Sequence, residues 1–102
     1  MRIKPGVKIG GASPELAIGL QIMDSVHREL FGKEITVTSI CDGKHSIGSL
    51  HYRGEAADLR TKDLEPQSRS QLAQALQQAL GADWDVVLEK DHIHVEYDPE
   101  PS

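Results

Sequence analysis

Histidine and acidic residues recur in two short stretches of this 102-residue chain, at spacings that suit a metal ion. The first stretch runs from Ser49 to Asp58 and contains His51, so an imidazole and a carboxylate stand seven positions apart. Between them, Gly54 permits backbone conformations that other residues avoid. The second stretch, residues 91–94, reads Asp-His-Ile-His. One carboxylate and two imidazoles from these stretches predict a zinc site.

Three protein ligands leave the fourth tetrahedral position open for water, which is the arrangement of catalytic rather than structural zinc sites. A single carboxylate leaves net positive charge on the ion, and that charge lowers the pKa of bound water to about 7. Strand alternation places His92, His94 and Glu96 on one face, so either histidine is a candidate ligand. We expect Zn²⁺ as the cofactor, although His and Asp ligands also suit other first-row ions.

The pattern Ser-x-His-x-x-Gly-x-Ala-x-Asp, followed by a late Asp-His-x-His, resembles the zinc D-alanyl-D-alanine carboxypeptidases and dipeptidases of the M15 peptidase family. The signalling domain of hedgehog proteins shares that zinc fold, and residues 45–52 look like its version of the first motif. The resemblance covers residues 45–97, about half of the chain. It implies that His51, Asp58 and His94 bind the metal and that His92 flanks the site.

A zinc hydrolase also needs a base that takes the proton of the attacking water and passes it to the leaving amine. The resemblance implies Asp91, three positions before His94, as this base. Glu89 is the competitor, because the hedgehog branch places its glutamate further upstream. His45 is expected to line the cleft and to hydrogen-bond the tetrahedral intermediate, or else it is a loop histidine without a role.

The sequence departs from the M15 pattern where many of those peptidases carry Ser-Gly-Tyr-Arg. Here residues 39–42 read Ser-Ile-Cys-Asp, so the arginine that would stabilise the developing anion is absent. Lys44 and Arg53 are the candidates to supply the missing positive charge and to contact substrate. The alternative for both is an ordinary exposed cation in contact with solvent.

The surrounding elements predict an α+β domain, in which a mostly antiparallel sheet packs with two helices. The resemblance implies that this domain has the hedgehog/DD-peptidase zinc fold. Ser13 is a helix N-cap, and apolar residues at three- and four-residue steps continue the helix to about Phe31, before Gly32. A second helix begins after Pro66 and ends at Gly81. Strands are expected at residues 34–40, 84–89 and 92–97, with residues 55–60 extended.

Composition limits the partners and the location of the chain. Apolar residues make up 38% and charged residues 26%, as in globular domains, and the net charge of −5 argues against a nucleic-acid partner. One domain over residues 1–102 is expected, with an arm or edge strand at 1–12 and a frayed tail at 98–102. Neither a signal peptide nor a membrane span is evident, so the sequence predicts a cytoplasmic protein, without membrane association and monomeric.

The predicted zinc site and the resemblance together imply a zinc metallopeptidase of the D,D- or L,D-carboxypeptidase or endopeptidase type. By resemblance its substrate is a peptidoglycan stem peptide, cut at or near a D-alanine bond. A phage or prophage lysis enzyme that another protein releases to the cell wall fits this reading. The alternative is a catalytically inactive, zinc-stabilised binding module of the same fold, as the missing arginine allows.

Overall fold

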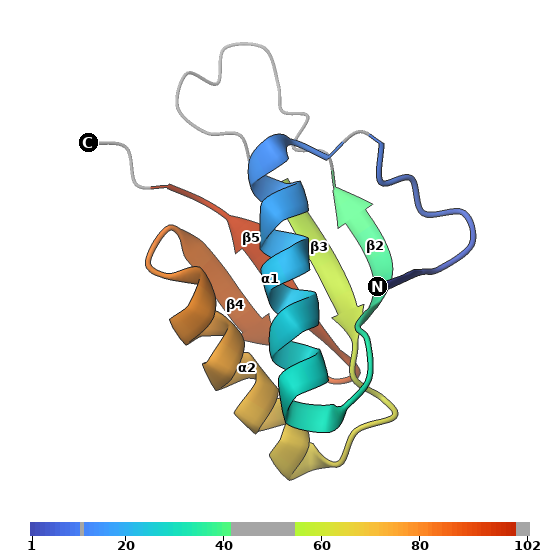
Figure 1. The fold of residues 1–102 in the computed structure, drawn as a ribbon, viewed down its shortest axis with the longest axis vertical. Helices are drawn as coiled ribbons and strands as arrows, with labels where there is room; N and C mark the ends of the chain where they lie inside the picture. Colours follow the sequence, from blue (N-terminus) through green and yellow to red (C-terminus); the bar gives the residue numbers. More distant parts are fainter. Residues whose placement is uncertain (11, 42–54, 100–102) are drawn as a thin grey trace.

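The computed structural model describes residues 1–10, 12–41 and 55–99, and it places two helices on one face of a five-stranded sheet (Figure 1). The strand order is β1-β2-β3-β5-β4. Strands β1 and β2 pair in parallel, and all the other neighbours are antiparallel. The predicted α+β class is therefore confirmed. The elements are β1 (Arg2–Ile3), α1 (Pro14–Phe31), β2 (Thr36–Cys41), β3 (Glu55–Arg60), α2 (Pro66–Leu80), β4 (Trp84–Leu88) and β5 (His92–Tyr97).

The boundaries of α1 follow from its end residues, as the sequence predicts. Ser13 Oγ accepts a hydrogen bond from the Leu16 N–H at 3.1 Å, which satisfies a donor that the helix leaves open. Gly32 adopts a left-handed conformation with φ 74°, and its N–H donates to the Arg28 carbonyl at 2.8 Å. Helix α2 likewise ends before Gly81, at the predicted residue.

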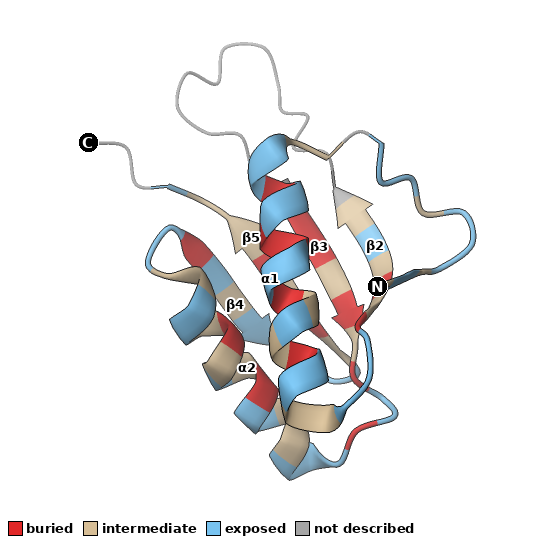
Figure 2. Ribbon diagram, viewed as in Figure 1, coloured by how far each residue is buried: buried red, intermediate tan, exposed pale blue. Residues whose placement is uncertain are grey.

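The hydrophobic core lies between the helices and the inner face of the sheet (Figure 2). The apolar stripes of both helices point toward it, and so does every second residue of the central strands. The outer face of the sheet carries polar side chains such as Asp58 and His94, beside the exposed Val87, and this is the face of the predicted site. The fully buried side chains include Leu16, Leu20 and Met23 of α1, Leu72 and Leu76 of α2, and Val37, Leu59, Ile93 and Val95 of the strands.

Strand β1 forms one edge of the sheet within the segment for which the sequence predicts an arm or an edge strand. The Arg2 N–H donates to the Ile35 carbonyl at 2.8 Å, and the Lys4 N–H donates to the Val37 carbonyl at 2.9 Å. Strand β2 begins at Thr36 rather than at the predicted residue 34. The Ile35 N–H donates instead to the Asp24 carboxylate of α1, so it does not enter the sheet ladder.

At the opposite edge of the sheet, the side chain of Gln77 hydrogen-bonds the backbone of β4. Gln77 of α2 donates from Nε2 to the Trp84 carbonyl at 2.8 Å and accepts the Val86 N–H on Oε1 at 3.2 Å. Its amide thus contacts the edge strand β4 much as a neighbouring strand would. Among the described residues, neither helix combines the length and apolar character needed to cross a membrane.

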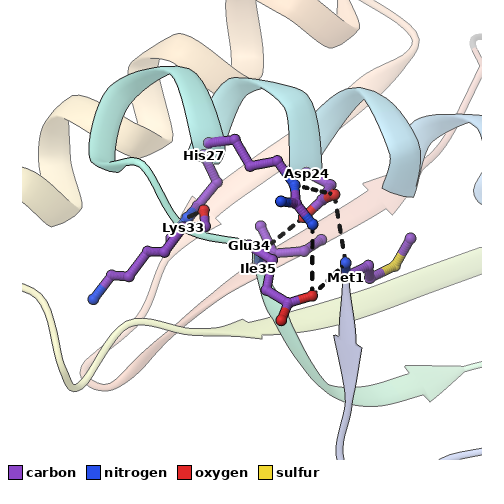
Figure 3. Close-up of polar contacts among 7 residues, drawn as sticks. Met1, Asp24, His27, Lys33, Glu34 and Ile35 are labelled. Atoms are coloured by element: carbon purple, nitrogen blue, oxygen red, sulfur yellow. Dashed lines mark hydrogen bonds and ion pairs between the residues drawn. The ribbon is translucent and has the colours of Figure 1, made fainter.

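Asp24 joins α1 to the start of the sheet (Figure 3). It accepts hydrogen bonds from the Ile35 N–H at 3.0 Å and from Arg28 Nε at 2.9 Å, and the Met1 ammonium lies 3.5 Å away. The same ammonium pairs with Glu34 at 2.6 Å. Burial disfavours the Asp24 anion, but these hydrogen bonds and positive charges outweigh it, so the pKa of Asp24 lies below its usual value.

We expect the Asp24 cluster to make stability fall in acid. Because the folded state lowers the pKa of Asp24, its contribution is present above the unfolded pKa and is lost as pH falls through the folded pKa. Asp24→Asn should lower the free energy of unfolding by about 1–2 kcal/mol at neutral pH and reduce its decline in acid. Urea unfolding between neutral and acid pH measures both effects. The exposed Asp63→Asn is the control, and an equal loss in both variants would contradict the prediction.

Candidate functional site

The residues that the sequence predicts as metal ligands meet in part on the outer face of the sheet. Asp58 of β3 and His94 of β5 are direct cross-strand partners. Asp58 Oδ1 and His94 Nδ1 are 2.9 Å apart and joined by a hydrogen bond. The other ring nitrogen, His94 Nε2, lies 3.1 Å from Glu96 Oε1. The outer face thus brings together Asp58, His94 and Glu96, as the alternation along β5 predicts.

The two carboxylates determine the charge of His94. A neutral imidazole has only one N–H to donate, whereas here both ring nitrogens face a carboxylate oxygen. Burial opposes the charged ring, but the hydrogen bonds to Glu96 and Asp58 outweigh it, so the pKa of His94 lies above its usual value. The ring of His94 therefore takes up a proton more readily than a free imidazole does.

His92 flanks this cluster and belongs to a second acid–imidazole pair. Its Nδ1 is hydrogen-bonded to Asp91 Oδ1 at 2.9 Å, and its Nε2 lies 3.8 Å from Asp58 Oδ1. The hydrogen bond to His92 lowers the pKa of the exposed Asp91. Glu89 is the first residue of the β4–β5 connection, and its N–H donates to the His92 carbonyl at 2.9 Å. Both predicted bases are therefore at this end of β5.

A β-bulge shapes the sheet next to Asp58. The pairing of β2 with β3 shifts between Val37 and Ser39, which leaves Thr38 as the extra residue. The Thr38 hydroxyl donates to the Asp58 carbonyl at 3.3 Å. Bulges occur often beside functional sites, where they re-aim a side chain. The sequence gives no signal for this bulge, because β2 reads as a regular alternating strand.

Several predicted site residues lie outside the described part of the chain: His45, His51, Lys44 and Arg53. Among the described residues, no group of three or more His, Cys, Asp or Glu side chains is arranged to hold a metal ion. The described chain thus supplies two adjacent donors of the predicted set, Asp58 and His94.

A hollow of about 210 Å³ opens beside Asp58 and His92. Its wall contains residues that sequence reasoning did not single out, namely Lys4, Thr38, Arg60 and Lys62. Arg60 stands two residues after Asp58 on β3, so alternation alone places both on one face. Lys4 reaches the hollow through the parallel pairing of β1 with β2, which nothing in the sequence indicates.

Comparison with known proteins identifies the family. The model of the hedgehog amino-terminal signalling domain matches residues 20–96, from the first turns of α1 to the end of β5. The Indian hedgehog protein of Gallus gallus is 43% identical over 53 residues, which are 52% of this chain and 13% of that protein. The Indian hedgehog B protein of Danio rerio is 42% identical over the same shares. The chain thus spans only 13% of the length of these relatives, and no solved structure matches.

These matches correct the predicted function. The M15 carboxypeptidase assignment is wrong, because the family that matches is the hedgehog signalling domain. A peptidase that cuts peptidoglycan, and with it a phage lysis enzyme, is contradicted by the same finding, as is the peptidoglycan partner.

Two further predictions change with it. The cytoplasmic location is contradicted, since the match is to a domain of signalling proteins. The inactive zinc-stabilised module of the peptidase fold is not favoured either. The motif shared by the two branches misled the sequence reading, although residues 45–52 already resembled the hedgehog version of the first motif. This chain belongs to the hedgehog amino-terminal signalling domain family.

Proposed function

We propose that this chain is a recognition domain that acts by binding a partner protein through the outer face of its sheet. The observation that carries the proposal is the match of residues 20–96 to a signalling domain, because signalling by a protein of this kind requires contact with another molecule. The helices cover the inner face (Figure 2), so among the described elements the outer face is the side of the sheet that no helix covers.

Charged and imidazole side chains give the outer face the means to recognise a partner. Asp58, His94 and Glu96 are linked by hydrogen bonds, and each remains about a third exposed or slightly less. Such a preorganised polar cluster adds little reorganisation cost when a partner binds. Arg60 and the hydrogen-bonded Asp91–His92 pair extend the polar surface on the same side.

The function is tested by competition with a relative. We expect an excess of this chain to displace the labelled signalling domain of Gallus gallus Indian hedgehog from chick cells that bind it. Asp58→Asn should weaken the displacement about tenfold, because it removes a charge from the centre of the face. Asp63→Asn, which removes the same charge from an exposed turn, should displace like the unchanged chain.

Two results would contradict this function. The first is the absence of displacement at a concentration of chain that saturates any specific binding. The second is equal displacement by the Asp58→Asn and Asp63→Asn variants, since the outer face would then have no part in binding. Circular dichroism of each variant verifies that it is folded.

We also propose, as a separate matter, that Asp58 and His94 bind Zn²⁺ together with His51. Support comes from the donor set, because Asp58 Oδ1 and His94 Nδ1 are adjacent and both are ordinary zinc ligands. Glu96 hydrogen-bonds the other ring nitrogen of His94 and would fix the orientation of that ring. The zinc ion would link Asp58 on β3 and His94 on β5 with His51.

The zinc proposal predicts metal content. We expect about one zinc per chain after equilibrium dialysis against buffered Zn²⁺, and weaker retention by about 10- to 100-fold or more in Asp58→Asn and in His51→Ala. Asp63→Asn is the matched control and should retain the ion. Elemental analysis gives the content. A chain that takes up no zinc, or variants that retain it fully, would contradict this ligand set.

A further inference from the structure

Four basic side chains gather on one side of the outer face: Arg2, Lys4, Arg60 and Lys62, here called the basic cluster. Arg2 and Lys4 flank Ile3, which packs against the core, so alternation turns both toward the outer face. Two hollows, of about 210 and 320 Å³, share Lys4 and Arg60 in their walls. The basic cluster therefore lines two neighbouring hollows.

The cations of the basic cluster are not ion-paired with the two acids that lie beside them, Asp58 and Asp91. Within the described ranges, none of its four side chains forms an ion pair with another described residue. The two carboxylates that line the first hollow are already engaged, Asp58 with His94 and Asp91 with His92. The surface is locally positive in a chain of net charge −5.

We propose that the basic cluster binds an acidic segment of the partner protein, with glutamate or aspartate side chains entering the two hollows. Arg60 can receive a carboxylate through two parallel hydrogen bonds, and Lys4 adds a point charge between the hollows. Ile3 and Pro5 in the second hollow offer apolar contact to the aliphatic part of such a side chain.

The acids at the cluster favour a peptide over a uniformly charged polyanion. Asp58 and Asp91 stand in the wall of the first hollow and would repel a ligand with an unbroken row of negative charges. A peptide can place neutral residues opposite these carboxylates and acidic residues opposite the cations. This inference rests on the proposed function, and it names the chemistry of the partner.

Direct binding tests the inference with the full chain. The probe is a short fluorescein-labelled peptide in which glutamate alternates with serine, and its counterpart has glutamine in place of glutamate. Fluorescence anisotropy should show saturable binding of the glutamate peptide, weaker at high salt, and none of the glutamine peptide. Arg60→Gln and Lys4→Gln should each weaken binding by about fivefold, as expected for partly exposed ion pairs.

The matched control is Lys8→Gln, which removes the same charge outside the two hollows and should leave the affinity unchanged. Equal losses in Lys8→Gln, equal binding of the glutamine peptide, or no binding would each overturn the inference. So would tighter binding of a sulfated oligosaccharide that displaces the peptide and depends on the same two residues. Melting temperatures establish that each variant is folded.

The outcome is separable from that of the proposed function. If the chain displaces the labelled domain from cells but does not bind the glutamate peptide, the inference of an acidic partner segment is contradicted. The proposed recognition function is then unaffected. Peptide binding without displacement from cells would support the basic cluster as an anion site and contradict the function.

Discussion

Gly19→Ala should lower the free energy of unfolding by about 2 kcal/mol, although alanine is the better helix former. A Cβ on Gly19 would lie 2.3 Å from Cη2 and 2.6 Å from Cζ2 of Trp84, far inside contact distance. Trp84 is only 8% exposed and packs against the tilted ring of Tyr97 with ring centroids 5.1 Å apart, so the indole has little room to move. The overpacking cost exceeds the roughly 1 kcal/mol that alanine gains in helix propensity.

Urea unfolding of a double-mutant cycle measures this effect. In a Trp84→Phe background the shorter ring relieves the clash, so Gly19→Ala should there be neutral or stabilising. The helix control is Ser25→Ala at an exposed position of α1, which should change stability by less than about 0.5 kcal/mol. A Gly19→Ala variant as stable as the unchanged chain would show that α1 and β4 do not pack as described.

Arg69→Met should lower the free energy of unfolding by about 3 kcal/mol. The Arg69 guanidinium donates from Nε to the carbonyls of Thr61 and Leu64, both at 2.9 Å. Its other nitrogens donate to the Lys90 carbonyl at 3.2 Å and to the Lys62 carbonyl at 3.3 Å. One side chain of α2 thus joins the β3–α2 connection to the β4–β5 connection, and methionine would leave four carbonyls without this donor.

Arg69→Lys separates charge from geometry. An ammonium is a point charge and cannot span the four carbonyls, so lysine should recover less than half of the loss. Arg60→Met is the control, because Arg60 is also half-buried but has no ion pair with another described residue. Thermal and urea unfolding give the values. A change within about 0.5 kcal/mol for Arg69→Met would refute the role of this arginine.

Local signals in the sequence are enough to predict most of the elements. The Ser13 and Gly32 caps define α1, and alternation places Ile93 and Val95 in the core and His94 on the outer face. Helix caps and strand alternation depend on residues that are close together in the sequence, so they can be predicted from one sequence alone. The order of the strands is different, because the parallel pairing of β1 with β2 joins residues more than thirty positions apart and has no local signature.

Part of the candidate site can likewise be predicted from the sequence, and part depends on how the chain packs. The Asp58–His94 pair follows from the motif and from cross-strand register, whereas the Thr38 bulge and the approach of Lys4 and Arg60 depend on tertiary packing. The function was mispredicted because ligand motifs describe which atoms face the site and not what is done there. Residues that distinguish a hydrolase from a recognition domain, such as the absent arginine of the M15 pattern, carry that information.

The measurement that tests the central claim most directly is displacement of the labelled Gallus gallus Indian hedgehog signalling domain from the cells that bind it, with the unchanged chain as competitor. If the chain is a recognition domain of this family, displacement is saturable, and Asp58→Asn weakens it about tenfold, in parallel with binding of the chain itself. If the chain neither binds these cells nor displaces the labelled domain, the proposed recognition function is contradicted.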